Sequence, residues 1–185
     1  MAERSTKPKK PRRSGRPRKI EKTAESYFEA VARRDPDAMA SHWHAQGVDD
    51  LVPIAPLRGP GAVRSFFSEL FTAVPDLEFT VTQMVVDSQG ATVQWRMRGT
   101  FDGGAFQGIE PTGRTIDLRG CDCLEVDDDG LITGNTAYYD GAAFARQVGL
   151  LPAQDSGADR AMRTGFNTVT RVRSALAQRK GGTTP

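Results

Sequence analysis

The first part of the chain carries apolar residues at helical spacing. From Ile20 they recur at intervals of three and four, which is the period of one buried helix face. This face consists of Ala24, Tyr27, Phe28, Val31 and Ala32. Asp35 and Pro36 then have the residue types of an N-cap and a first helical position. They predict a short second helix, which carries Met39, His42 and Trp43.

A third apolar face begins after Gly59 and ends before Pro75, which cannot continue a helix. Its members are Val63, Phe66, Phe67, Leu70 and Phe71. Residues 47–58 lie between the second and third helices and contain Pro53 and Pro56, so they are expected to form short or edge strands.

Beyond Pro75 the apolar period changes to two, which is typical of half-buried strands. Long strands are predicted over residues 77–81, 91–98, 114–126 and 131–139, with an acidic turn at 127–130 between the last two. Asp140 is placed as the N-cap of a helix over 141–148. A final amphipathic helix is predicted over 158–179.

This order of elements predicts an α+β fold with three N-terminal helices packed on a curved antiparallel sheet. We expect a cone-shaped α+β barrel with an open mouth, where a ligand pocket would lie. Residues 1–20 have almost no large apolar side chains and should be a disordered basic arm. Residues 21–152 should form the domain, and 153–185 a linker with an amphipathic basic helix.

Charge, apolar runs and cysteine content indicate the cellular compartment in which the protein is expected. The 185 residues have a net charge of +2, but residues 1–20 carry +8 and the remainder −6. No run of 18 apolar residues occurs, so no membrane span is expected. Cys121 and Cys123 are two apart, where a disulfide would be strained. A reduced, cytoplasmic protein is the simplest interpretation.

Four phrases of the sequence resemble the SnoaL-like polyketide cyclases, or ester cyclases, of the nuclear transport factor 2-like superfamily. These are VPDLEFTV (74–81), WRMRGTFDGGAFQGIEPTGRTI (95–116), GCDCLEVDDDGLI (120–132) and YYDGAAFARQVG (138–149). The resemblance implies a pocket between helices and sheet, and often a homodimer. It also implies cyclisation or isomerisation of a hydrophobic carbonyl compound by acid/base catalysis that uses no metal or cofactor. Members of the superfamily include non-catalytic binders, so the resemblance does not by itself establish turnover.

The resemblance places the catalytic base of these cyclases five residues after Ile132, and this sequence has Ala137 there. Epoxide hydrolases of the superfamily need an acid beside an arginine on a neighbouring strand, but the segment around Arg96 contains none. Asp122 is the remaining candidate base, because burial among apolar neighbours would raise the pKa of its carboxyl group. Tyr139 shares the strand parity of Ala137 and is the candidate hydroxyl donor. A purely structural role for Asp122 stays open.

Seven further residues are candidates for binding the substrate in the predicted pocket. They are His42, Trp43, Phe71, Trp95, Arg96, Phe106 and Asp140. Apolar alternation favours Trp95 as pocket wall, whereas comparison with the hydrolases favours Arg96. Asp140 fits a helix cap better than a ligand contact. His42 and His44 have no carboxylate at ligand spacing, so no metal site is predicted.

The basic segment PKKPRRSGRPRK (8–19) resembles an AT-hook, with Arg13, Gly15, Arg16, Pro17 and Arg18 as candidate nucleic-acid contacts. An extended Arg-Pro core fits the narrow minor groove of A·T-rich DNA. Ser14 replaces the first arginine of the usual core, so binding would be weak and salt-sensitive. Two hypotheses follow: a cyclase or isomerase, or a non-catalytic ligand-binding regulator whose arm contacts DNA.

Overall fold

The computed structural model describes residues 15–52 and 54–181, and the side chains of these residues as far as residue 177. Its helices are α1 (Arg16–Ala32), α2 (Pro36–Ser41), α3 (Gly59–Ala73), α4 (Gly141–Gln147) and α5 (Gly157–Gly181). Its strands are β1 (Trp43–Leu51), β2 (Leu57–Arg58), β3 (Glu78–Val86), β4 (Gly90–Phe101), β5 (Arg114–Val126) and β6 (Ile132–Tyr139). The predicted α+β class is confirmed.

A curved, unclosed sheet of six strands has the order β2-β1-β6-β5-β4-β3. The long strands β3 to β6 form the predicted antiparallel meander, and Asp122 lies opposite Ala137 in the β5–β6 register. The sheet is not antiparallel throughout, because β1 runs parallel to β6. A parallel neighbour needs a long crossover connection, and here α3 and three of the long strands lie between β1 and β6 in the chain.

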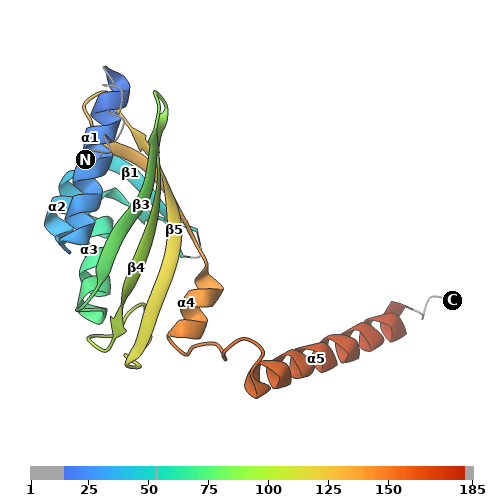
Figure 1. The fold of residues 1–185 in the computed structure, drawn as a ribbon. Coiled ribbons are helices and arrows are strands. Elements are labelled where there is room, and N and C mark those ends of the chain that lie inside the picture. Colours follow the sequence, from blue (N-terminus) through green and yellow to red (C-terminus); the bar gives the residue numbers. More distant parts are fainter. Residues whose placement is uncertain (1–14, 53, 182–185) are drawn as a thin grey trace, which may run out of the picture.

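Helices α1, α2 and α3 cover one face of this sheet, as Figure 1 shows. The core lies between them and the inner sheet face, with Tyr27, Met39 and Val63 fully buried on the helix side. Val93 and Leu124 are their buried counterparts on the sheet. Helix α4 follows the sheet at the opposite end from the acidic turn, and α5 extends away from the body (Figure 1).

The expectation that order begins near Ile20 is wrong, because α1 begins at Arg16. Gly15 has a positive φ (73°) at the N-cap, which glycine adopts without strain, and Pro17 lies in the first turn, where its missing N–H is harmless. The Arg16 side chain donates to the carbonyl oxygens of Ser88 (2.9 Å) and Val126 (3.0 Å) and also pairs with Asp128. The first helical turn is therefore attached to the β3–β4 and β5–β6 turns.

These contacts also correct the expected DNA-binding core. Arg16, Pro17 and Arg18 are helical, so they do not form the extended Arg-Pro segment of an AT-hook. Arg13 and the other residues of the arm up to Ser14 lie outside the described residues, and the expectations for them stay predictions.

The second helix is shorter than predicted. It ends at Ser41, His42 is its C-cap, and Trp43 begins β1. Residues 42 and 43 have residue types that fit either a helix or a strand. Trp43 belongs to the strand because it pairs with Ile132 of β6. Among the described residues, no helix is both long and apolar enough to cross a membrane.

Candidate functional site

An aromatic cavity lies between helices α1, α3 and α4 and the inner face of the sheet. Its volume is about 80 Å³, whereas one buried water needs roughly 10–15 Å³. The cavity therefore has room for several waters or for a compact part of a ligand. Its aromatic lining residues are Tyr27, Phe28, Phe66, Phe67, Phe71, Phe79, Trp95, Phe106, Tyr139 and Phe144. Five of these rings are only half-buried, so the cavity approaches solvent along them: Phe67, Phe71, Phe79, Tyr139 and Phe144.

Two buried carboxyl groups, those of Asp49 and Asp122, interrupt this apolar lining. The Asn135 amide bridges them, because its Nδ2 donates to Asp49 Oδ1 (2.9 Å) and to Asp122 Oδ2 (3.0 Å). Trp95 Nε1 donates to the other oxygen of Asp122 (2.7 Å). Asp122 thus accepts a hydrogen bond at both oxygens, whereas Asp49 Oδ2 is buried and has no partner among the described residues.

The electrostatics of the two acids follow from this geometry. Burial raises the pKa of Asp49 to about 7, and the negative charge of Asp122 adds to the rise. Burial also raises the pKa of Asp122 to about 6, although the hydrogen bonds from Trp95 and Asn135 oppose the rise. Because the two groups interact, they titrate as a pair, and the pair loses its protons around pH 6 to 7. Asp122, with two donors, is the better-stabilised anion.

Two tyrosines of the cavity remain neutral hydroxyl groups. Burial raises the pKa of Tyr139 to about 12. Burial and the charges of Asp49 and Asp122 raise the pKa of Tyr27 well above its usual value. Both phenols are therefore available as hydrogen-bond donors at any pH at which the acid pair titrates.

Five of the residues predicted from the sequence line the cavity: Phe71, Trp95, Phe106, Asp122 and Tyr139. Ala137 also lines it, directly opposite Asp122 on the neighbouring strand. The expected position of the cyclase base therefore lies inside the cavity, and it carries a methyl group. What these residues do chemically stays a prediction.

Four predicted binding residues do not line the cavity. Trp43 is buried in the core, and the ring nitrogens of His42 contact the Ala38 carbonyl (2.7 Å) and the Ser26 hydroxyl (2.8 Å). Arg96 points to the outer sheet face, where its Nε donates to Asp117 Oδ1 (2.6 Å). Successive side chains of a strand point to opposite faces, so Arg96 points away from the cavity that the Trp95 indole lines.

Asp140, the fourth of these residues, is the N-cap of α4, as its residue type and position indicated. Its carboxylate accepts from the Ala143 backbone N–H (2.8 Å). Capping satisfies one of the free N–H groups of the first turn, and the side chain does not line the cavity. The described residues contain no group of three or more His, Cys, Asp or Glu side chains that could hold a metal ion.

Sequence reasoning missed Asp49 and Asn135. A signal existed for Asn135, because it has the same strand parity as Ala137 and Tyr139, which were already assigned to the pocket side. Asp49 lies two residues before the buried Leu51, so both point to the same face of β1. Pro53 and Pro56, which follow, obscured the extent and the register of this strand in the sequence. Both residues are buried polar groups, which are rare unless they are paired or functional.

Gly120 allows the indole of Trp95 to reach Asp122. A Cβ atom at Gly120 would overlap the six-membered ring of that indole. Gly120→Ala is expected to lower the free energy of unfolding by about 1–3 kcal/mol, as overpacking does. It should also change the tryptophan fluorescence. Urea denaturation provides the measurement, with Gly134→Ala as the control, because a Cβ there would meet only the flexible Glu125 side chain. Equal losses in both variants would contradict this account.

Comparison with known proteins agrees with the fold. The model of the SnoaL-like domain family matches residues 24–135, which include both acids and the bridging asparagine. No curated protein matches the chain. Many solved structures share the fold, at sequence identities that support the fold alone.

One of these structures is described as a SnoaL-like polyketide cyclase from Jannaschia sp. CCS1. It is 21% identical, with a TM-score of 0.68, and the match covers 77% of this chain and 99% of that one. A second, described as a polyketide cyclase from Xanthomonas campestris pv. campestris, is 23% identical, with a TM-score of 0.62, and covers 72% and 99%. A third, from Catenulispora acidiphila DSM 44928, has a ketosteroid isomerase-like fold and was solved with trimethylamine. It is 18% identical, with a TM-score of 0.58, and covers 72% and 96%.

Proposed function

The chain belongs to the SnoaL-like domain family, and from this premise we propose that its cavity binds a hydrophobic, carbonyl-bearing small molecule and isomerises or cyclises it by proton transfer. The observation that carries the proposal is the free oxygen of Asp49. Oδ2 is buried in an aromatic cavity without a partner among the described residues, beside a second acid that is held as an anion. Such a group can take up and release a proton close to neutral pH.

Each polar residue has a distinct role in the proposed reaction. Asp49 is the base, whose pKa is raised mainly by burial, and Asp122 is the anion whose charge raises it further. Asn135 positions both carboxyl groups, because its Nδ2 contacts each of them. Tyr139 donates a hydrogen bond to the substrate oxygen. These roles differ from the sequence-based interpretation, which placed the base at Asp122.

The proton transfer balances without a redox partner. Asp49 Oδ2 takes a proton from the carbon next to the substrate carbonyl, and the C–H electron pair forms the enolate double bond. Negative charge moves to the substrate oxygen, where the Tyr139 hydroxyl stabilises it. In an isomerisation, protonated Asp49 returns the proton to another carbon of the conjugated system. In a cyclisation, the enolate carbon attacks a second carbonyl group, and the new alkoxide receives the proton.

The size and lining of the cavity limit the part of the substrate that reacts. About 80 Å³ admits a single small ring or a short chain beside the acids. A larger substrate needs rings of the lining to move, and the half-buried ones are Phe67, Phe71, Phe79, Tyr139 and Phe144. The apolar walls favour a substrate with few polar groups besides its carbonyl oxygens.

Small cyclic ketones provide a direct test of this function. A β,γ-unsaturated cyclic ketone should be converted to its conjugated isomer, which is followed by ultraviolet absorbance. In D₂O buffer, a saturated cyclic ketone should exchange its α-hydrogens for deuterium faster with the protein than without it. Proton NMR follows this exchange. Quenching of tryptophan fluorescence reports binding, and the cyclic hydrocarbon of the same size controls for simple occupancy. Failure of every ketone to bind would contradict the proposal as a whole.

Ala137 supports a second candidate function, namely ligand binding without turnover. The acid expected on the last strand is absent, and the methyl group in its place can only form part of the apolar wall. The same experiment separates the two functions. Ketones that quench tryptophan fluorescence but neither isomerise nor exchange above the buffer rate would support the binding protein and contradict the enzyme.

A further inference from the structure

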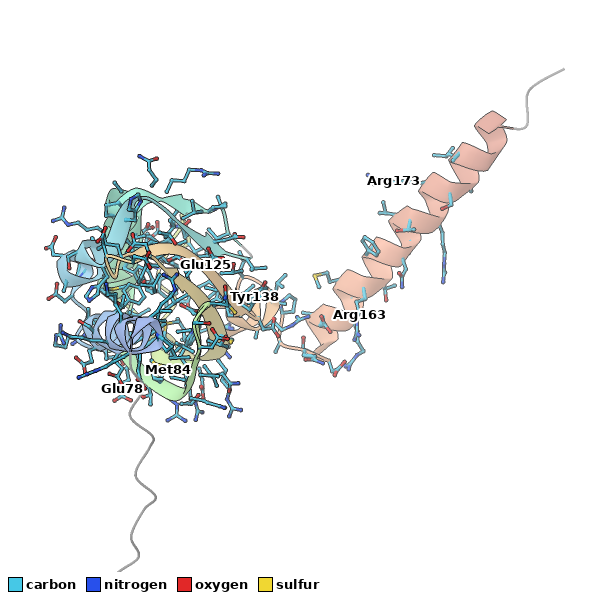
Figure 2. The ribbon with its side chains drawn as sticks, turned by 90° about the horizontal axis from the view of Figure 1, so that it is seen from above. Glu78, Met84, Glu125, Tyr138, Arg163 and Arg173 are labelled. Atoms are coloured by element: carbon cyan, nitrogen blue, oxygen red, sulfur yellow. The ribbon has the colours of Figure 1, made fainter. Side chains whose placement is uncertain are left out.

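Helix α5 is long. Its start is attached to α4 by the ion pair between Asp159 and Arg146 (3.5 Å), but none of its later side chains, as far as Ala177, is buried against another described element. It has 25 residues and extends away from the body in both views (Figures 1 and 2). Every side chain from Arg160 to Ala177 is exposed. Large apolar side chains are among them, and they form what we call the apolar stripe: Met162, Phe166, Val169, Val172 and Leu176. Phe166 is 72% exposed, which is costly for an aromatic ring unless a partner covers it.

The apolar stripe has the geometry of a docking face. Its residues follow one another at steps of four, three, three and four, so they stay on one side of the helix. Arg173 is on the same side, four residues after Val169 and three before Leu176, and Figure 2 shows it on the exposed part of α5. A complementary surface should therefore offer an apolar floor together with negative charge.

Net charge restricts the kind of partner. Residues 157–185 contain six basic side chains and one acidic side chain. Two copies of α5 packed against each other would bring these like charges together, which opposes a simple helix pair. Residues 21–156 contain 21 acidic and 10 basic side chains, so the body of the protein has the complementary charge.

The body has a groove that matches the apolar stripe. It lies between α1 and the sheet-edge strand β3 and is called here the acidic groove. Glu21, Glu25 and Glu29 of α1, four residues apart, form one wall. Phe79, Val81 and Met84 of β3 provide the apolar floor, and Val81 is 37% exposed. Glu21 and Glu25 make no ion pair with any described residue, and Glu29 has only a loose contact with Arg33 (4.0 Å).

The position of the acidic groove gives a second reason for it to be covered. Strand β3 is the edge of the sheet, and its outer row of backbone groups pairs with no other strand among the described residues. Exposed edges with apolar side chains invite uncontrolled association, and proteins commonly cover them with a helix. A helix in the acidic groove would lie along this edge and would place its arginines opposite the glutamates.

We propose that α5 of one copy docks its apolar stripe in the acidic groove of a second copy, and that the exchange is reciprocal. Each copy has one helix and one groove, so a two-fold dimer uses both and leaves no free stripe. The interaction is independent of the cavity chemistry. A second copy of this chain fits the apolar stripe, because the body of that copy combines an acidic wall, an apolar floor and an open strand edge.

Sedimentation velocity of the full chain over a concentration series tests the proposal. The wild-type protein should be a dimer, and Phe166→Asp should raise the dimer dissociation constant by about tenfold or more, as loss of a central aromatic anchor does. Asn167→Asp adds the same charge away from the apolar stripe of α5 and should leave the dimer intact. Far-UV circular dichroism and the melting temperature of the body verify that each variant is folded.

Mixing two variants identifies the surface against which α5 docks. Glu21→Lys/Glu25→Lys removes the acidic wall and should also give a monomer. An equimolar mixture with Phe166→Asp should form a heterodimer, because one intact helix then meets one intact groove. Pairing between two α5 helices would give no recovery, since one helix of every mixed pair would carry the Phe166→Asp substitution. Pairing through the outer sheet face would leave both variants dimeric.

Several results would overturn the proposal. A monomeric wild-type protein would do so, as would a dimer that survives Phe166→Asp, or a mixture that stays monomeric. Binding of the wild-type protein to vesicles of anionic phospholipid or to A·T-rich duplex, with loss of that binding in Phe166→Asp and no dimer, would assign α5 to a different partner and contradict the reciprocal exchange.

Discussion

Replacing Asp49 by Asn should slow the isomerisation of a β,γ-unsaturated cyclic ketone by about 10²–10⁴-fold, which is the usual contribution of a positioned base. An asparagine keeps the shape of the side chain and can still accept from Asn135 Nδ2, so the cavity and its affinity for ketones should change little. The loss should therefore appear in kcat rather than in binding. Ultraviolet rates and fluorescence titrations on the same samples measure the two quantities.

The neighbouring acid provides a matched control. Asp50 has the same charge, is next to Asp49 in β1, and does not line the cavity. Asp50→Asn should change the rate far less than Asp49→Asn, because Asp50 does not line the cavity and its charge contributes least to the raised pKa of Asp49. Equal losses in both variants would indicate a general effect of charge and would remove Asp49 from the proposed reaction.

A comparison with Asp122→Asn decides which acid carries the proton. If Asp49 is the base, the rate should rise with pH as Asp49 loses its proton at about pH 7. Removal of the Asp122 charge should then lower the pKa of Asp49 and move this rise to lower pH, with activity retained. The opposite pattern, in which Asp122→Asn abolishes turnover and Asp49→Asn only weakens it, would restore the sequence-based assignment of the base to Asp122.

The helices and the long strands could be predicted because their signals are local. The helical repeats in residues 20–32 and 59–74, and the alternation in 91–98 and 114–126, each lie within one element. The parallel pairing of β1 with β6 could not be predicted in this way, because it joins Asp49 to Asn135 across 86 residues. No periodicity within either strand specifies the partner or its direction.

The same distinction applies to the cavity. Asp122 and Tyr139 were found through the family resemblance and strand parity, which are properties of residues 120–139 alone. Asp49 enters the site through β1, whose position depends on tertiary pairing. The resemblance directed attention to Ala137, where an acid was expected. The structure instead places a buried acid, Asp49, on β1, which is the neighbour of β6 on the side away from β5. Leu51, two residues after Asp49, pairs with Ala137.

Burial of the two acids should make the stability of the protein fall as the pH rises from about 4 to about 7. The pKa of Asp49, about 7, and that of Asp122, about 6, lie above the ordinary aspartate value of 3.8. In this pH range the folded protein therefore holds protons that the unfolded chain has released, and the free energy of unfolding falls with increasing pH. At lower pH both states are protonated and the penalty disappears.

Asp49→Asn should remove most of this penalty. The variant's free energy of unfolding relative to wild type should increase by roughly 2–4 kcal/mol between about pH 4 and about pH 8, because each unit of pKa shift corresponds to about 1.4 kcal/mol. Urea denaturation at several pH values measures the difference. Asp76 and Asp117, whose pKa values are lowered by hydrogen bonds, are present in both proteins, so their opposite pH dependence cancels. Asp50→Asn should depart from the wild-type curve much less than Asp49→Asn does, because the charge of Asp50 contributes least to the raised pKa of Asp49. If the Asp49→Asn and wild-type curves ran parallel over the whole pH range, Asp49 would hold no proton in the folded state, and the proposed base would lose its physical foundation.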